Sequence, residues 1–285
     1  MRPLKRESLK PLKDTSAYPN KRKYLAFRLL ETFGEFCSIC EMRIGQEKIE
    51  HHKLYKEWQK KLSAKDWPDL LLLCADCRRH MTKEELKKKS LGNYLWPDND
   101  RTFSIPPTSS PFLYEKIEVE QAIVQEDKRK IKSKKPFIRI RVNPALSKKI
   151  TRKAQNTIDL FQLNTPFLQT GKKKLVIPVS DYLQATDMRA EQRLKSWNEA
   201  EETAAGLKAL MKKKKNNNST ALEDNILHLI SLTAKACGNW SVWATVFWNE
   251  FEDVALLNSI FVEKRQEGVS ENIFVGTNKQ VLVPR

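Results

Sequence analysis

The chain has 285 residues, of which 40% are hydrophobic and 31% charged, and its formal net charge is +17 at pH 7. This length and composition favour one large or two ordinary soluble domains that form a core without disulfide bonds. The excess of positive charge indicates a polyanionic partner, nucleic acid before membrane; a highly charged, solvated surface is the alternative.

The first 23 residues are basic, include three prolines and have no apolar run, so we expect neither a signal peptide nor a membrane span there. We expect residues 1–23 to form a basic arm that either lies along a DNA backbone or is solvated. The next segment, 24–33, has apolar residues at helical spacings and predicts a helix that ends at Gly34.

Four of the five cysteines form two C-x-x-C pairs, Cys37 with Cys40 and Cys74 with Cys77, and 33 residues separate the pairs. Each such turn presents two sulfurs on one side, so two pairs can close a tetrahedral zinc site. A redox function explains one C-x-x-C pair but not two. We therefore predict a structural zinc ion. Cysteines in metal spacing also indicate a reducing, cytoplasmic compartment.

An acidic residue and a histidine, Glu50 and His51, lie between the two cysteine pairs. A carboxylate is a hard oxygen ligand for a divalent cation, and histidine is a base whose unperturbed pKa lies near neutral pH. This combination predicts a second, catalytic site beside the structural zinc.

Three short segments together carry a resemblance to a known family: C-S-I-C at 37–40, I-E-H-H-K at 49–53 and W-P-D-L-L-L-L-C-A-D-C at 67–77. Their arrangement resembles the HNH, or ββα-metal, nucleases. The resemblance implies a zinc-braced module in which a strand pair carries the acidic-His element and a helix follows the last cysteine. It also implies hydrolysis of DNA with Mg²⁺ or Mn²⁺ as the catalytic ion.

The resemblance assigns a role to three residues of the loop between the cysteine pairs. His51 matches the general base, Glu50 a ligand of the catalytic ion, and Asp69 the slot that the central Asn usually fills. A shifted register, in which His51 is the metal ligand and His52 the base, is the alternative.

The pattern departs from the family directly after the last cysteine, where many members have Asn or His as a metal ligand and this chain has Arg78. A guanidinium stays protonated at neutral pH and cannot bind a cation. Three consequences stay open: His80 replaces the missing ligand, Arg78 binds the scissile phosphate, or the protein binds DNA without cutting it.

A narrower resemblance is to the HNH subunit of Septu-type and retron-associated antiphage systems, which works beside an ATPase. It extends to segments outside the zinc motif: A-Q-N-T-I at 154–158, L-N at 163–164, C-G-N-W-S-V-W at 237–243, and the ending at 276–285. The resemblance implies DNA and an ATPase subunit as partners, with no membrane.

Prolines between residues 97 and 111 predict a boundary near residue 105, which separates an HNH module at 24–105 from a region at 106–285. From Tyr114 onward the sequence predicts a short strand. The segment 128–153 has twelve Lys or Arg residues and no acidic residue.

Alternation within the basic segment predicts a strand at 137–142 that has Arg139 and Arg141 on one face. We predict that Lys134, Lys135, Arg139 and Arg141 contact DNA phosphates. A solvated run of charges is the alternative.

Apolar spacing predicts further helices at 154–163, 181–210 and 221–236, with a flexible loop at 211–219. Trp240, Trp243 and Trp248 are interpreted as core or interface residues before base-stacking residues. The expected fold is therefore α+β and mainly helical: an N-terminal zinc-braced HNH module, then a mostly α-helical C-terminal region. A metal-dependent endonuclease is the leading function, and a silent DNA-binding subunit or a zinc-structured scaffold are the alternatives.

Overall fold

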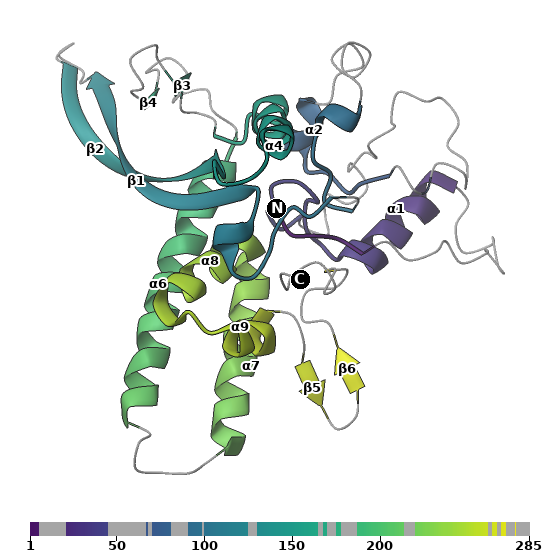
Figure 1. The fold of residues 1–285 in the computed structure, drawn as a ribbon, viewed down its shortest axis with the longest axis vertical. Helices are drawn as coiled ribbons and strands as arrows, with labels where there is room; N and C mark the ends of the chain where they lie inside the picture. Colours follow the sequence, from purple (N-terminus) through teal and green to yellow (C-terminus); the bar gives the residue numbers. More distant parts are fainter. Residues whose placement is uncertain are drawn as a thin grey trace.

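The computed structural model describes residues 1–5, 21–44, 67, 70–80, 91–98, 100–124, 130–164, 168–169, 175–177, 187–213, 220–261, 264–266, 269–271 and 277. Within this part of the chain the fold is mainly helical, with one four-stranded and one two-stranded sheet. Figure 1 shows a long curved hairpin on one side, a pair of long helices below it and the N-terminal helix on the other side. The predicted mainly helical fold is confirmed at this level.

The N-terminal part contains short elements connected by irregular backbone. They are α1 (Lys21–Phe33), α2 (Ala75–Arg79) and the 3-10 turns η3 (Leu91–Asn93) and η4 (Pro107–Ser109). Helix α1 ends as predicted, because Gly34 adopts a φ of 74° and donates its N–H to the carbonyl of Leu30 at 2.7 Å. A left-handed residue at this position favours glycine, which has no Cβ penalty.

The first residues of the sequence differ from the basic arm that we expected. Met1, Arg2 and Leu4 are buried, and Leu4 forms a β-bridge with Thr277. The Arg2 guanidinium donates to the carbonyl of Phe33 at 2.7 Å. Residues 1–4 are therefore part of the core and Lys5 is exposed, while Lys21 to Lys23 belong to α1 and residues 6–20 lie outside the described residues.

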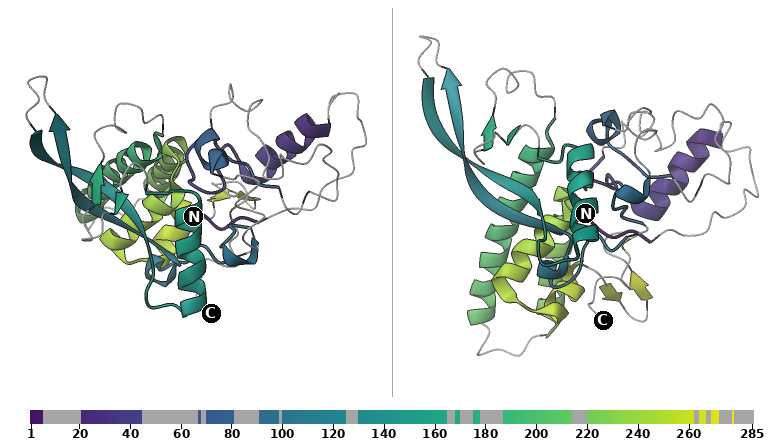
Figure 2. Two further views of the ribbon diagram at one scale, coloured as in Figure 1. Left: turned by 90° about the horizontal axis from the view of Figure 1, so that it is seen from above. Right: turned by 45° about the horizontal axis from the view of Figure 1, so that its top comes forward.

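The main sheet is built on a hairpin of β1 (Phe112–Val124) and β2 (Lys130–Val142), paired antiparallel from Phe112↔Val142 to Val124↔Lys130. Both strands are much longer than the segments predicted from the sequence. The sheet order is β2-β1-β4-β3, with β4 (Leu175–Ile177) parallel to β1 and β3 (Leu168–Gln169) antiparallel to β4. Figure 2 shows the hairpin projecting beyond the helices in two further views.

The outer edge of β2 is occupied by side chains near its C-terminal end. Asn164 accepts the N–H of Ile140 at 2.9 Å and donates to the Ile140 carbonyl at 2.8 Å. The buried guanidinium of Arg193 donates to the carbonyl of Ile138 at 3.1 Å. At these two residues the side chains satisfy backbone groups that an edge strand would otherwise leave unpaired.

The remaining elements are α4 (Lys148–Leu160), α6 (Arg189–Lys213), α7 (Thr220–Cys237), α8 (Trp240–Phe251), α9 (Val254–Phe261) and the two strands β5 (Lys264–Gln266) and β6 (Val269–Glu271). Helix α4 begins before the predicted residue 154 because the Ser147 side chain caps its N-terminus at Ile150. Helix α6 packs against α8, and α9 packs against both α7 and α8. The predicted start at residue 181 and most of the loop at 211–219 lie outside the described residues.

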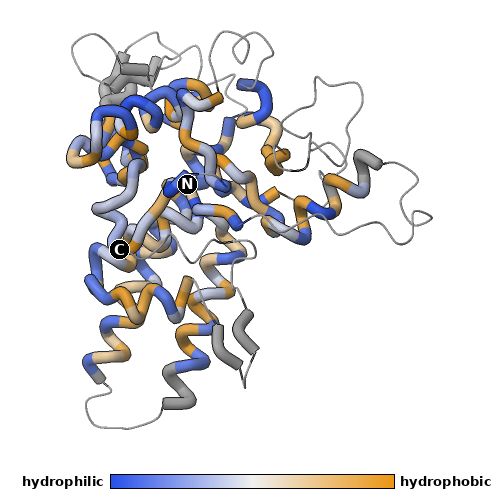
Figure 3. Tube along the Cα trace, turned by 45° about the vertical axis from the view of Figure 1, so that its right-hand side comes forward, coloured by the Kyte–Doolittle hydropathy of each residue, from blue (hydrophilic) through white to orange (hydrophobic). Residues whose placement is uncertain are grey.

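One hydrophobic cluster includes residues from both sides of the boundary predicted at residue 105. Leu25 and Phe33 from α1, Phe112 from β1, and Trp240 and Trp243 from α8 all belong to it. The Phe103 and Trp240 rings meet edge to face at 5.0 Å. Trp240 and Trp243 are thus core residues, as interpreted from the sequence. Figure 3 shows apolar and polar residues interspersed along the helices, as expected for helices with one buried face.

Candidate metal centre

The first cysteine pair lies in a short turn directly after α1, and we refer to residues 36–43 as the knuckle. Phe36 and Arg43 form an antiparallel bridge across this turn, and the Cys37 N–H donates to the Met42 carbonyl at 3.0 Å. Glu41 adopts a left-handed φ of 64° and donates its N–H to the Cys37 carbonyl at 3.0 Å. These bonds close the turn so that Cys37 and Cys40 face one point.

The second cysteine pair begins helix α2. Cys74 is the N-cap of α2, and its sulfur accepts the N–H of Cys77 at 3.4 Å. The apolar run before it is buried, as predicted, and Leu72 exchanges hydrogen bonds with Ser38 of the knuckle at 2.7 and 3.2 Å. Hydrogen bonds between Ser38 and Leu72 therefore connect the two cysteine pairs, and the four cysteines themselves are free thiols.

The four sulfurs form a cluster that could hold a metal such as zinc. The Sγ atoms of Cys37, Cys40, Cys74 and Cys77 all lie within 4.8 Å of one another, and the Cys40–Cys74 separation is 3.6 Å. A tetrahedral zinc site with Zn–S distances of about 2.3 Å requires sulfurs about 3.8 Å apart. The clustering predicted from the spacing is confirmed.

Burial and the neighbouring thiols shift the pKa values of Cys37, Cys40 and Cys77. Burial raises the pKa of Cys40 and of Cys77 well above the usual value, and hydrogen bonds with Cys37 and Cys74 raise both further. Burial also acts to raise the pKa of Cys37, but hydrogen bonds from the other three thiols outweigh it and lower that pKa well below its usual value. A bound divalent cation would favour the deprotonated form of all four sulfurs, because it would take the place of their protons.

A cation from a distant helix contacts this cluster. Arg189, at the start of α6, donates from Nη1 to the Cys77 sulfur at 3.3 Å, and its side chain is 1% exposed. The same guanidinium donates to the carbonyls of Phe161 and Gln162 at 2.8 and 3.3 Å. Arg189 therefore joins the sulfur cluster to the end of α4.

Asp187 holds the Arg189 guanidinium in place. Its carboxylate accepts from Arg189 Nε at 2.9 Å and from Nη2 at 2.6 Å. Burial acts to lower the pKa of Arg189, but hydrogen bonding to Asp187 and the charge of Cys77 outweigh it and raise that pKa. Burial likewise acts to raise the pKa of Asp187, and the hydrogen bond from Arg189 outweighs it and lowers that pKa. Arg189 therefore keeps its positive charge beside the sulfurs.

The knuckle also contacts the start of α8, in the segment 237–243. The buried carboxylate of Glu41 accepts from the Ser241 N–H at 2.7 Å and from its hydroxyl at 2.6 Å. The Asn239 N–H donates to the Glu41 carbonyl at 3.0 Å. The sequence singled out this segment only by resemblance and did not identify Glu41 as its partner.

The residues predicted to perform catalysis, Glu50, His51 and Asp69, lie outside the described residues, as does His52. The two other tentative site residues are described. Arg78 lies in α2 and is partly exposed, and His80 follows as the C-cap, with its N–H donating to the Arg78 carbonyl. Their roles stay predictions.

Four of the five basic residues predicted to contact DNA, all except Arg78, lie on β2, and each of the four has a carboxylate partner. Arg139 and Arg141 both pair with Glu115 on β1, Arg141 at 2.8 Å. This shared partner confirms that the two arginines lie on one face of the strand. The two lysines are paired more loosely: Lys134 with Glu118 at 3.2 Å and Lys135 with Glu191 at 3.9 Å.

Comparison with known proteins finds no matching family model, no matching curated protein and no matching solved structure. The HNH resemblance accordingly rests on the sequence motifs. Among the helices of the described residues, none combines the length and the hydropathy needed to cross a membrane.

Proposed function

We propose that the chain is a metal-dependent HNH endonuclease that hydrolyses DNA phosphodiester bonds, as the effector subunit of an ATPase-associated antiphage defence system. The observation that carries this proposal is the four-sulfur cluster, whose two pairs bracket Glu50 and His51 in the order of the HNH pattern. Structural zinc at the cluster would fix both ends of the loop that carries these residues. The net charge of +17 supports a polyanionic substrate.

In this proposal the imidazole of His51 accepts a proton from water while the water oxygen bonds to phosphorus. Glu50, with Asp69 or His80, would hold Mg²⁺ or Mn²⁺, and the bound ion would stabilise negative charge on the phosphate and on the leaving oxygen. The P–O bond opposite the attacking oxygen breaks. The four cysteines would hold zinc, which would only brace the fold.

Cleavage by alanine variants tests the assignment. A general base contributes about 10²–10⁴-fold, so His51→Ala should abolish detectable cleavage at saturating Mg²⁺ or Mn²⁺ while zinc content and DNA binding stay normal. His52→Ala should have the smaller effect, because neighbouring side chains of a strand point to opposite faces. The reverse result would make His52 the base. Full activity in both variants would contradict the proposed site.

A catalytically silent DNA-binding subunit is the second candidate, and the identity of Arg78 favours it. Arginine follows the last cysteine where the HNH pattern usually supplies a metal ligand. Plasmid DNA incubated with the protein, each metal and the partner separates the two candidates: binding without cutting under every condition identifies the silent subunit.

The ATPase partner is proposed from the resemblance alone. Two of the three tryptophans of α8, Trp240 and Trp243, offer it little apolar surface because they are 1% and 0% exposed, whereas Trp248 is partly buried. Large apolar side chains are instead exposed on α6 and α7 at Leu210, Met211, Leu229 and Leu232. Co-purification with the operon neighbours is the test, and a protein that runs alone and cuts fully without a partner would contradict it.

A further inference from the structure

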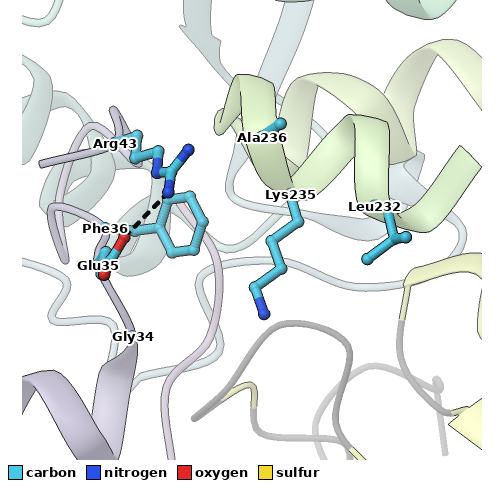
Figure 4. Close-up of a pocket in the computed structure, with 7 residues that line it drawn as sticks. All are labelled: Gly34, Glu35, Phe36, Arg43, Leu232, Lys235 and Ala236. Carbon is cyan, nitrogen blue, oxygen red and sulfur yellow. Dashed lines mark hydrogen bonds and ion pairs between the residues drawn. The ribbon is translucent and has the colours of Figure 1, made fainter. Parts of the chain in front are cut away.

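A cavity of about 490 Å³ lies between the knuckle and the C-terminal end of α7, and none of the four clustered cysteines lines it. Its lining residues are Gly34, Glu35, Phe36, Arg43, Leu232, Lys235 and Ala236. Ligand sites in proteins commonly have volumes of about 300–1,000 Å³, so one nucleotide fits this space. Figure 4 shows Arg43 and Lys235 on facing elements, with the Phe36 ring between them.

The two cations of the cavity retain donors for an anion. Arg43 Nη2 lies 3.1 Å from Glu35 Oε2, so the carboxylate orients one end of the guanidinium and leaves other N–H groups unused. Lys235 has no ion-pair partner within the described part of the chain. With one carboxylate and two cations, the cavity has a net charge of +1. A phosphate accepts from both a guanidinium and an ammonium.

The two walls are fixed relative to each other by backbone contact. A Cβ at Gly238, just after α7, would lie 2.9 Å from the backbone carbonyl oxygen of Glu41 and 3.2 Å from the backbone nitrogen of Arg43. The backbone of the knuckle and the chain just after α7 are therefore in close contact beside Arg43 and Lys235. A cavity between such walls is already formed before a ligand binds, which lowers the entropy cost of binding.

The position of Lys235 has a simpler explanation, because a cation in the last turn of a helix interacts favourably with the helix dipole. That explanation accounts for a lysine on α7. It does not account for a second cation, oriented by Glu35, on the facing knuckle, nor for the apolar wall at Leu232, which is 46% exposed.

We propose that this cavity binds one nucleotide, with its phosphate between Arg43 and Lys235 and its apolar surface against Leu232. The inference rests on the proposed function, because it takes nucleic acid as the substrate class. It adds a second phosphate contact outside the catalytic residues. The nucleotide is either free or part of a single strand, and both sources present the same phosphate chemistry.

Calorimetric titration of the zinc-loaded protein without Mg²⁺ or Mn²⁺ tests the site, with dAMP in one arm and a short single-stranded oligonucleotide in the other. The variants are Lys235→Gln and Lys235→Arg, with Lys208→Gln as control. Lys208 is an exposed lysine of α6 that pairs with Glu250 at 2.6 Å, outside the cavity.

Binding in at least one arm should weaken about tenfold in Lys235→Gln, stay close to normal in Lys235→Arg and stay normal in Lys208→Gln. If the oligonucleotide binds, its logarithmic salt dependence should flatten by about 0.7 in Lys235→Gln, the effect of one lost phosphate contact. Binding of dAMP identifies a free nucleotide as ligand, and binding of the oligonucleotide alone identifies a nucleotide within a strand.

The site is overturned if neither probe binds, or if Lys235→Gln behaves like Lys208→Gln. Cleavage by the unmodified protein, measured in parallel, keeps this outcome separate from the proposed function. A protein that cuts DNA, with binding independent of Lys235, overturns the cavity alone. A protein that never cuts, with Lys235-dependent binding, overturns the nuclease alone.

Discussion

The carboxylate of Glu41 caps helix α8 at Ser241, a residue 200 positions further along the chain. The usual N-cap position belongs to Asn239, which adopts a left-handed conformation and makes no side-chain capping bond. Glu41 supplies the missing acceptor from the knuckle. A carboxylate at a helix N-terminus is also favoured by the helix dipole. The knuckle and α8 thus depend on each other.

Replacement of Glu41 should lower stability. In Glu41→Ala the Ser241 N–H and hydroxyl lose their acceptor in a buried site, which costs about 1–3 kcal/mol. Urea denaturation measures the free energy of unfolding, with Glu250→Ala as an exposed control. A Glu41→Ala protein as stable as the control would show that water replaces the carboxylate without cost.

Two glycines provide a matched pair for the contact between the knuckle and α7. Gly238 has a φ of 73° and no room for a Cβ, whereas Gly206 in α6 has no atom within 4 Å of that position. Gly238→Ala should therefore destabilise the protein by more than about 1 kcal/mol. Gly206→Ala should stabilise it by about 0.5–1 kcal/mol, because alanine favours the helix. Thermal unfolding of both variants checks the opposite signs, and equal shifts would contradict the close approach.

Loss of one zinc ligand should unfold the N-terminal module rather than merely slow DNA cleavage. Structural zinc supplies about 10–16 kcal/mol of apparent binding free energy in small domains. Cys40→Ser and Cys74→Ser should lose both zinc and the cooperative unfolding transition, whereas Cys237→Ser, outside the cluster, should retain them. Metal analysis and circular dichroism make the comparison. Folded unmodified protein without zinc would contradict the prediction.

The cation beside the cluster should strengthen metal binding. Partners of metal ligands typically contribute about 10–100-fold in affinity, so we expect Arg189→Met to release zinc more readily to a competing chelator by a factor in that range. Lys195→Met, at an exposed position of the same helix, is the control. Equal zinc affinity in the two variants would limit the role of Arg189 to its bonds with Asp187, Phe161 and Gln162.

The β2 cations should contribute to DNA binding unequally. Arg139 and Arg141 share Glu115, whereas Lys134 has a 70% exposed side chain and a longer ion pair. Replacement of all four basic residues, including Lys135, by Gln should flatten the logarithmic salt dependence of duplex binding by about 0.9 per lost contact. Most of the change should come from the two lysines. An unchanged salt dependence of duplex binding would show that these residues are solvated and do not contact DNA.

Local patterns in the sequence were sufficient for some features and not for others. The cysteine cluster was predictable because each C-x-x-C turn is local and metal spacing is diagnostic. The end of α1 was predictable because Gly34 follows a helical apolar pattern. The full length of β1 and β2 was not, because charged residues alternate there with few apolar ones and hide the strand period.

The contacts of Arg189 and Glu41 were not predictable for a different reason. Arg189 is one of 52 basic residues, and no local pattern distinguishes it from the others. Glu41 follows Cys40 directly, but its partner is far along the chain. Both contacts join surfaces that only the tertiary fold brings together, so their residues carry no signal of spacing or composition.

The pairing of Asn164 with both backbone groups of Ile140 limits how this chain can assemble. An exposed sheet edge invites a strand from another molecule, and such pairing is a common route to aggregation. At the base of the hairpin an incoming strand would first have to displace Asn164 and Arg193. The sheet is therefore protected at this place from growth into a larger sheet.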